Sequence, residues 1–387
     1  MKLKLTSIIF FGILVQILAT QGILTFNIFN VIGIWEVKKV LHPIGLLLVF
    51  IPFIIRLCSL KQIIPSKESF VLFSYLFLQY IILIYNGISV LSFLYSLREV
   101  VVLFLIIIVY QSFSFKKQYF ETIAKGLLCL VIANIIFVII TMVIGAEQYM
   151  KLITGRFFWP FDPLLKFKIS TFIGGFYRSP GLIGDSTSVG FFGVFAFFII
   201  SHSEIKKFFW IPLILVFLSF TRSVYLVITI YFLLQILSNK KYVKLTIALV
   251  PIIIVFVVYL FSLNLLSLES LWMRIDNWMT EVDLDSNIVF GGNLGGIGSA
   301  APKGSGFVSI MDSYWLYVYH GIGLLGVCLV IYFFFKKTAY TKDNLFILIG
   351  FIVSGLFVTY SQSIPFLVFF PLLAIKNWWI TNTDNIL

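Results

Sequence analysis

Long apolar runs recur along almost the whole chain, and they restrict its fold more than any other feature. A helix that crosses the hydrocarbon core of a membrane needs roughly 20 apolar residues, with a range of about 17–25. The runs that reach or approach this length begin near Leu5, Leu41, Phe70, Ser92, Thr122, Val189, Phe208, Ser223, Val243, Trp315, Asn344 and Gln362. The sequence therefore predicts an all-α, polytopic membrane protein with about twelve spanning helices.

The composition agrees with a membrane protein. Hydrophobic residues make up 60% of the 387 residues and charged residues only 11%, whereas soluble domains carry about 25% charged residues. Because so little polar surface is available, the apolar surface of the helices must face lipid. No polar linker or convincing internal repeat divides the chain, so we expect residues 1–387 to form a single integral membrane domain. The three cysteines are spaced neither for a metal site nor for a disulfide framework.

The basic residues gather in one set of connections between the predicted spans. If the N-terminus is cytoplasmic, the cytoplasmic connections hold 17 of the 28 basic residues and five of the 16 acidic ones. The opposite side then holds 11 basic and 11 acidic residues and is neutral. Lys and Arg concentrate on the cytoplasmic side of membrane proteins. We therefore expect both termini in the cytoplasm, and we attribute the net charge of +12 to orientation in the membrane rather than to nucleic-acid binding.

One apolar stretch, residues 208–237, is interrupted by Thr221-Arg222-Ser223. A single helix would bury the charge of Arg222 near the bilayer centre, at a cost of at least about 2.5–3.5 kcal/mol. It would also move the lysines at 240, 241 and 244 to the outer side. Two spans that meet at Arg222 keep these lysines cytoplasmic, and we predict this arrangement. The first of the two spans would then be short, about 13 residues or roughly 20 Å.

Two long connections lie on the predicted outer side, at about residues 145–188 and 264–313, and every other connection is short. Binding and catalytic residues are found disproportionately on loops that a rigid scaffold holds in place. We therefore expect any chemistry to concentrate on these two loops and on the helix ends beside them.

The first outer loop ends in Arg178-Ser179-Pro180-Gly181-Leu182-Ile183-Gly184-Asp185-Ser186-Thr187-Ser188, directly before an apolar run. The glycines and the proline predict a tight turn, and the three hydroxyl residues Ser186, Thr187 and Ser188 are typical caps of a helix N-terminus. Free N–H groups at that helix end, with Arg178 folded back towards them, would form an anion site. An ordinary capped loop, with an arginine that reaches the membrane interface, explains the same pattern and stays an alternative.

Two further arginines are candidates for binding. Arg222 lies inside an apolar stretch, where a charge indicates a lined cavity or a ligand. The alternative for Arg222 is a structural ion pair with Asp312 or Asp185. Arg98 lies beside Glu99 where the fourth run begins. These two side chains either pair locally or turn towards different partners.

The second outer loop predicts an amphipathic helix over Leu265–Met279, followed by a Gly-rich stretch over Gly291–Gly298. The Gly-rich stretch has neither the preceding strand nor the following helix of a dinucleotide site. Asp312 then precedes the tenth run. A carboxylate at a partly dehydrated interface could act there as a general base, or it could cap the helix. His320 lies eight residues further on and is either a second proton carrier or a hydrogen-bonded core histidine.

Four stretches in this order resemble the O-antigen polymerase and ligase superfamily of bacterial surface-polysaccharide enzymes. They are Arg178-Ser179-Pro180-Gly181 with Gly184-Asp185-Ser186, Thr221-Arg222-Ser223, Arg274 with Trp278, and Asp312-Ser313-Tyr314 before Gly321, Gly323 and Gly326. The resemblance covers mainly residues 170–335. Each motif is weak alone, and their order, spacing and common placement on the predicted outer face give the pattern its specificity.

The resemblance implies transfer of a growing glycan from undecaprenyl pyrophosphate to an acceptor hydroxyl, on the outer face of the bacterial cytoplasmic membrane. It assigns Arg178, Arg222 and Arg98 to the pyrophosphate, and it makes Asp312 the catalytic base. The residues implied for secondary contacts with the substrate are Tyr314, His320, Asp185 and Arg274. Because the lipid donor already carries the energy, neither a metal nor a cofactor is expected. A flippase and a chain-length regulator are the implied protein partners.

Ligase members of the superfamily typically have a histidine near the place where this chain has Asp312, which favours a polymerase over a ligase. A flippase of lipid-linked oligosaccharides also has around twelve helices, and it needs charges along a central cavity. Here the first six apolar runs carry little charge besides Arg98 and Glu99. A polymerase is therefore the main hypothesis, with a ligase, a transporter and another membrane transferase as alternatives.

Overall fold

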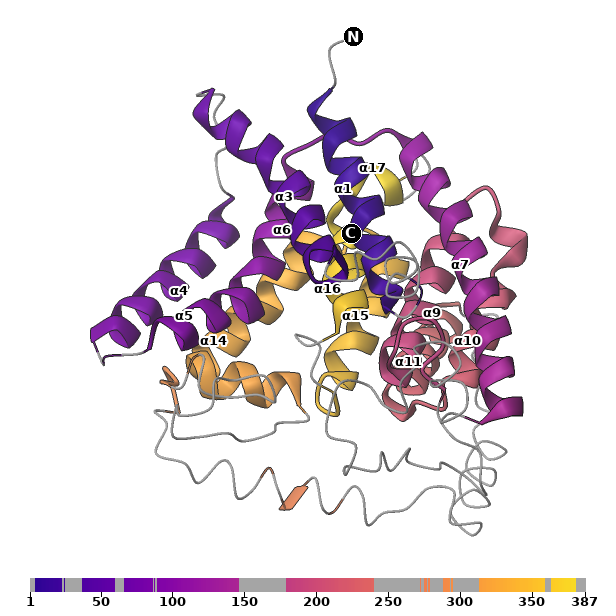
Figure 1. The fold of residues 1–387 in the computed structure, drawn as a ribbon. Helices are drawn as coiled ribbons and strands as arrows, with labels where there is room; N and C mark the ends of the chain where they lie inside the picture. Colours follow the sequence, from indigo (N-terminus) through magenta and orange to yellow (C-terminus); the bar gives the residue numbers. More distant parts are fainter. Residues whose placement is uncertain are drawn as a thin grey trace. The chain divides into compact units, whose positions relative to one another are not determined.

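The computed structural model describes residues 4–22, 24, 37–59, 66–85, 87, 89–145, 179–239, 272, 275–276, 278, 288–292, 294, 313–358 and 363–380. Within these residues the fold is all-helical, as the apolar runs predict (Figure 1). The helices are α1 (Leu5–Thr20), α3 (Val37–Cys58), α4 (Lys67–Tyr85), α5 (Val90–Ser96), α6 (Val102–Gln111), α7 (Lys117–Ile144), α9 (Ser186–Ser201), α10 (Trp210–Leu218), α11 (Arg222–Ser238), α14 (Tyr314–Thr338), α15 (Lys342–Ser354), α16 (Ile364–Phe369) and α17 (Lys376–Trp379). Shorter helical turns are the π-helical η1 (Leu97–Val101) and the 3-10 turns η2 (Lys206–Phe208) and η4 (Phe370–Ala374).

Four of the described helices are long and apolar enough to cross a membrane: Val40–Cys58 of α3, α4, α7 and α14. The shortest of these segments has 19 residues, which is about 29 Å of helix and close to the thickness of a bilayer core. Five further apolar helices have 10–17 residues. These helices indicate a membrane-associated protein. The total of twelve spans stays a prediction, and the span predicted near Val243 lies outside the described residues.

The chain divides into two compact units. Unit 1 contains Met1–Lys61, Ser112–Tyr225 and Ile364–Thr381, and unit 2 contains Gln62–Gln111, Leu226–Ser363 and Asn382–Leu387. One boundary between the units falls inside α11, so the first turn of that helix belongs to unit 1 and the rest to unit 2. The prediction of one membrane domain over the whole chain stays a prediction.

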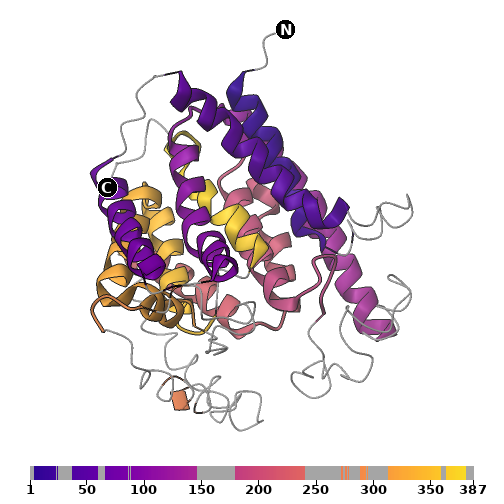
Figure 2. The ribbon, with the colours of Figure 1, turned by 60° about the vertical axis from the view of Figure 1, so that its left-hand side comes forward.

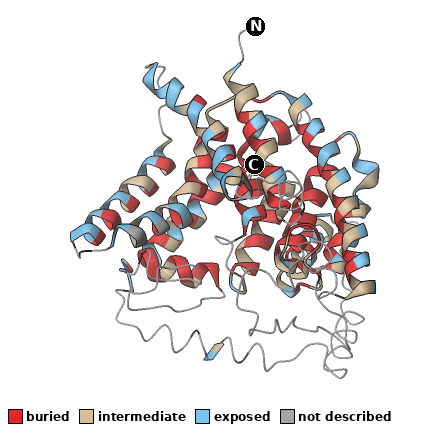
Figure 3. Cartoon of the chain, in the orientation of Figure 1, coloured by how far each residue is buried: buried red, intermediate tan, exposed pale blue. Residues whose placement is uncertain are grey.

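Helix α9 forms much of the core of unit 1. Residues 188–200 are all buried (Figure 3). A helix that is apolar all round needs to be covered on all sides, and α9 packs against α7, α10 and α16. The rings of Phe192 and Phe195 lie 5.6 and 5.8 Å from the ring of Phe369, between centroids.

Helices α1 and α3 lie side by side in unit 1 (Figure 2). Two glycines allow this close crossing. A Cβ atom at Gly12 would lie 2.9 Å from the carbonyl oxygen of Gly45, and a Cβ at Gly45 would lie 2.6 Å from Cγ of Gln16. Small residues at such crossings are typical of helix association in membranes, because they let the backbones approach closely.

Helix α14 is the main core helix of unit 2, and it packs against α4 and α15. The indole nitrogen of Trp315 donates to the carbonyl of Ile352 on α15 at 2.6 Å. Further along the helix, Phe333 meets the ring of Phe104 edge to face, with 5.4 Å between the centroids. These contacts fix α14 against both α15 and α6.

Candidate functional site

Two of the motifs identified in the sequence meet in unit 1. The hydroxyl of Thr221 donates to the carbonyl of Ser186, with 3.4 Å between the oxygens. A Cβ atom at Gly190 would lie 2.7 Å from Cγ2 of Val224, so α9 and α11 also touch near their N-terminal ends. We call residues 179–186 together with residues 219–223 the α9–α11 junction.

The turn that precedes α9 is held by a buried polar network. Gly181 and Gly184 have φ values of +53° and +108°, a backbone region that glycine adopts without strain. The N–H of Leu182 donates to Oδ1 of Asn134 on α7 at 3.0 Å. Asn134 in turn donates from Nδ2 to Oε1 of Gln21, at 2.7 Å, just beyond α1. Because Asn134 and Gln21 are fully buried, the network fixes the turn between α1 and α7.

The N-cap of α9 is Asp185. Its carboxylate accepts from the N–H groups of Thr187 at 3.3 Å and Ser188 at 2.8 Å. The expectation that Ser186, Thr187 or Ser188 caps this helix is therefore wrong. A carboxylate is a stronger acceptor than a hydroxyl, and its charge suits the positive end of a helix. Since the carboxylate already takes two N–H groups of α9, the positive charge at the junction comes mainly from Arg222.

Arg222 begins a helix, as the sequence predicts. Helix α10 ends at Leu218 and α11 begins at Arg222, and Phe220 between them has a φ of +46°. Helix α10 has nine residues, about 14 Å, so it is even shorter than the 13 residues predicted. The guanidinium-bearing side chain of Arg222 is exposed, whereas Ser219 and Thr221 are buried and hold the break. The junction therefore presents one arginine beside the N-termini of two helices.

Three other candidate residues lie in unit 2. Tyr314 and His320 are buried on the first turns of α14, and the rings of His320 and Tyr319 are 5.3 Å apart. The N-cap of α14 is Ser313, whose hydroxyl accepts from the N–H of Leu316 at 3.3 Å, so the alternative role of Asp312 as the cap is wrong. Arg98 is exposed in the π-helical turn η1, inside a helical run over residues 90–111 rather than at its start.

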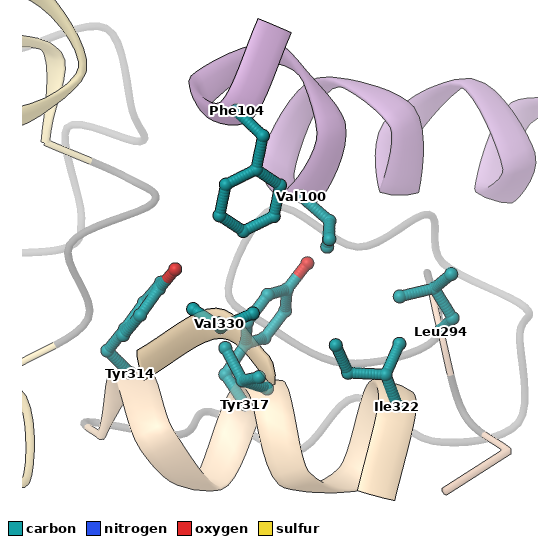
Figure 4. A pocket seen from close by; sticks show the side chains of 8 residues that line it. Val100, Phe104, Leu294, Tyr314, Tyr317, Ile322 and Val330 are labelled. Carbon is teal, nitrogen blue, oxygen red and sulfur yellow. The ribbon is translucent and has the colours of Figure 1, made fainter. Parts of the chain in front are cut away.

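Unit 2 also contains a small pocket (Figure 4). Its space corresponds to roughly one water molecule. The hydroxyls of Tyr314 and Tyr317 point towards Phe104 and Val100 across it. The lining residues are Val100, Phe104, Leu294, Tyr314, Tyr317, Val318, Ile322 and Val330. Since this lining offers two hydroxyls and no charged side chain, the pocket does not suit a phosphate group.

Arg178, Arg274 and Asp312 lie outside the described residues, so their roles stay predictions. In the second outer loop, Trp272, Ile275, Asp276 and Trp278 are helical where an amphipathic helix is expected. Of the eight predicted site residues, the structure places Asp185 and Arg222 in the same junction of unit 1.

Two polar clusters, one buried and one partly buried, were not singled out from the sequence. One is the Asn134 network described above. The other joins α4, α6 and α14 in unit 2, where Lys337 lies 3.6 Å from Oε2 of Glu68 and also donates to Ser66. Gln111 donates to the hydroxyl of Tyr340 at 2.6 Å, and burial raises the pKa of Tyr340 to about 12. A polar residue inside an apolar run, such as Asn134, is the signal that could have revealed the first cluster.

Comparison with protein-family models, curated proteins and solved structures found no match for this chain. Within the described ranges, no three His, Cys, Asp or Glu side chains gather as they would around a metal ion. The functional assignment therefore depends on the residues of the chain itself.

Proposed function

We propose that the protein is a glycosyltransferase that joins undecaprenyl-pyrophosphate-linked oligosaccharide repeat units into a surface polysaccharide. The observation that supports this proposal is the hydrogen bond from Thr221 to Ser186. It holds the first turn of α11, with Arg222, beside the N-terminal end of α9. Arg222 is suited to a pyrophosphate, because its guanidinium and the N-terminus of α11 both contribute positive charge.

The reaction needs charge stabilisation at the leaving group. The acceptor hydroxyl oxygen attacks the anomeric carbon, and the bond from that carbon to the pyrophosphate oxygen breaks. The bonding electrons leave with the pyrophosphate, so negative charge grows beside Arg222. A guanidinium can donate two parallel hydrogen bonds to phosphate oxygens and stabilise that charge. The proton of the acceptor passes to Asp312, which acts as the base in this proposal.

The remaining candidates take supporting parts in the proposal. Arg178 and Arg98 would add positive charge around the pyrophosphate. Asp185 is a positioning residue, because its carboxylate holds the first turn of α9. Secondary contacts with the glycan are assigned to Tyr314, His320 and Arg274. The protein would act on the outer face of the bacterial cytoplasmic membrane, with both termini in the cytoplasm, together with a flippase and a chain-length regulator.

The test is a reconstitution with a purified lipid-linked repeat unit, without ATP or nucleotide sugar. Proteoliposomes containing the protein should convert the single unit into a ladder of longer glycans on a gel. A single unit that stays unchanged contradicts the proposal. Transfer to a different terminal acceptor would indicate a ligase instead, and movement of intact substrate across the bilayer would indicate a transporter.

The role of Arg222 is tested in the same assay. Arg222→Ala should lower the rate of ladder formation by about 10²–10³-fold, the usual cost of removing one donor to a developing anion. Arg222→Lys should also be impaired, because an ammonium group cannot donate two parallel hydrogen bonds in a fixed geometry. Lys125→Ala is the matched control, since it removes one exposed positive charge from α7 of the same unit. Full activity of either Arg222 variant would remove this residue from the mechanism.

A further inference from the structure

Helix α14 is interrupted well inside its length. Gly323 has a φ of +69° and a ψ of −179°, which is not helical. The break lies nine residues beyond Tyr314, about 14 Å along a helix of 25 residues. The break divides α14 into two helices, and the residues on both sides of it belong to a stretch that is long and apolar enough to cross a membrane. Backbone groups that a break releases in an apolar environment need partners inside the protein.

The segment Ile288–Gly292 supplies these partners. The N–H groups of Leu324 and Leu325 donate to the carbonyls of Ile288 at 3.0 Å and Val289 at 3.3 Å. In the opposite direction, the N–H of Gly292 donates to the carbonyl of His320 at 3.2 Å. Tyr75 of α4 donates from its hydroxyl to the carbonyl of Ile322 at 2.6 Å. The backbone on both sides of the break is therefore hydrogen-bonded within unit 2.

This fit depends on two glycines. A Cβ atom at Gly323 would lie 2.2 Å from the carbonyl oxygen of Val289, and a Cβ at Gly291 would lie 2.5 Å from the backbone nitrogen of Gly323. Gly291 also has a positive φ, of +70°. No residue with a side chain fits at either position. The backbone of the segment therefore packs directly against the backbone of α14 at the break.

The side chains of the segment point away from the break. Ile288, Val289 and Phe290 are 65%, 48% and 48% exposed. Leu324 and Leu325, which bond to the segment, are 53% and 42% exposed on α14. We call these five residues the apolar patch. All five side chains are hydrocarbon, so the patch offers water nothing to hydrogen-bond.

We infer that Ile288–Gly292 is a re-entrant segment, which lies within the membrane and turns the apolar patch towards the lipid chains. Two observations together point to lipid rather than water. The patch continues onto exposed leucines of α14, a helix apolar enough to cross a membrane, and the backbone of the segment bonds inwards while its apolar side chains are exposed. The sequence instead placed this stretch in an outer loop. The inference does not depend on the proposed function, because it concerns only the placement of this segment.

The test uses a nitroxide spin label at position 290. The native cysteines Cys58, Cys129 and Cys328 are exposed, so each is first replaced by serine. Phe290→Cys is then labelled in proteoliposomes, and its relaxation is compared with oxygen, which concentrates in lipid, and with a nickel chelate, which stays in water. Phe77→Cys on α4 and Lys206→Cys on η2 are the lipid and water references. Stronger relaxation by oxygen, as at position 77, is the expected result, and relaxation like that at position 206 overturns the inference.

A second variant tests whether the backbone pairing holds the segment in place. Gly291→Ala should separate the segment from α14 and shift the label at position 290 from oxygen-favoured towards nickel-favoured relaxation. Gly87→Ala is the matched control, because Gly87 has a similar φ of +75° and nothing within 4 Å of a Cβ. It should leave the label unchanged. An unchanged label in Gly291→Ala would contradict the pairing. Neither readout needs glycosyl transfer, so failure here and failure of the proposed function are distinguishable.

Discussion

Asn134 is the residue on which the α9–α11 junction most depends. It accepts from the backbone of the turn before α9 and donates to Gln21 beyond α1. A Cβ atom at Gly181 would lie only 2.9 Å from Oδ1 of Asn134, so the turn and this amide also fit closely in shape. The position of the junction therefore depends on α7, through the buried side chain of Asn134.

The first prediction concerns this amide. Asn134→Leu keeps the number of side-chain heavy atoms and their branching and removes both hydrogen bonds, so it should lower the apparent Tm of the protein in detergent. Each buried polar group that loses its partner costs about 1–3 kcal/mol. Ile136→Ala, at a position on α7 that is 50% exposed, should change the free energy of unfolding by less than about 0.5 kcal/mol. Equal melting of Asn134→Leu and the unchanged protein would contradict the role of the network.

At the same scale, Lys337 illustrates what charge counting cannot predict. The sequence placed Lys337 among the charges on the cytoplasmic side, whereas the structure buries it beside Glu68 and Ser66. The lysine follows directly on an apolar run, so the sequence cannot distinguish a solvated charge at the helix end from a paired one. Only the packing of α14 against α4 decides between the two.

At the scale of elements, close packing of α9 against α10 depends on a glycine. A Cβ atom at Gly193 would lie 2.9 Å from Cγ2 of Val216 and 3.2 Å from its backbone nitrogen. The backbone nitrogen cannot move out of the way as a flexible side chain could. The distance between these helices is therefore set by the absence of a side chain at position 193.

The second prediction compares two glycines in helices of unit 1. Gly193→Ala should force α9 and α10 apart and destabilise the protein by about 1–3 kcal/mol, as overpacking of a core does. Gly126→Ala should have no such cost, because nothing lies within 4 Å of a Cβ there. Alanine should instead favour helix α7 by up to about 1 kcal/mol. Thermal unfolding of both variants in detergent measures the difference, and equal melting temperatures would argue against the close crossing.

The helix break before Arg222 could be predicted from sequence, because a charge inside an apolar stretch is costly in one continuous helix. The cap of α9 could not, since Asp185 and three hydroxyl residues follow one another and each can cap a helix. The pairing of Ile288–Gly292 with α14 could not be predicted from the sequence either. A Gly-rich stretch carries no periodicity, and the close approach of two backbones leaves no trace in the pattern of side chains.

At the scale of the whole molecule, the distribution of lysines links sequence and structure. In unit 1, Lys116 and Lys117 lie where α7 begins, and Lys206 and Lys207 lie in η2 beyond α9. These ends are close together, because the N–H of Glu204 donates to Oε2 of Glu121 on α7 at 2.9 Å. Exposed lysines therefore share one end of unit 1, as expected where all of them belong to the same membrane face.

The last prediction tests whether the membrane face with these lysines is the cytoplasmic one. With the N-terminus in the cytoplasm, Lys206 should be cytoplasmic and Tyr85, at the far end of α4 and 90% exposed, should be external. In a cysteine-free background, a membrane-impermeant maleimide should label Tyr85→Cys in intact spheroplasts and Lys206→Cys only after permeabilisation. The opposite pattern would reverse the orientation and place the α9–α11 junction on the cytoplasmic side. Polymerisation of a lipid-linked glycan outside the cell would then be excluded, since Arg222 and its substrate would lie on different sides of the membrane.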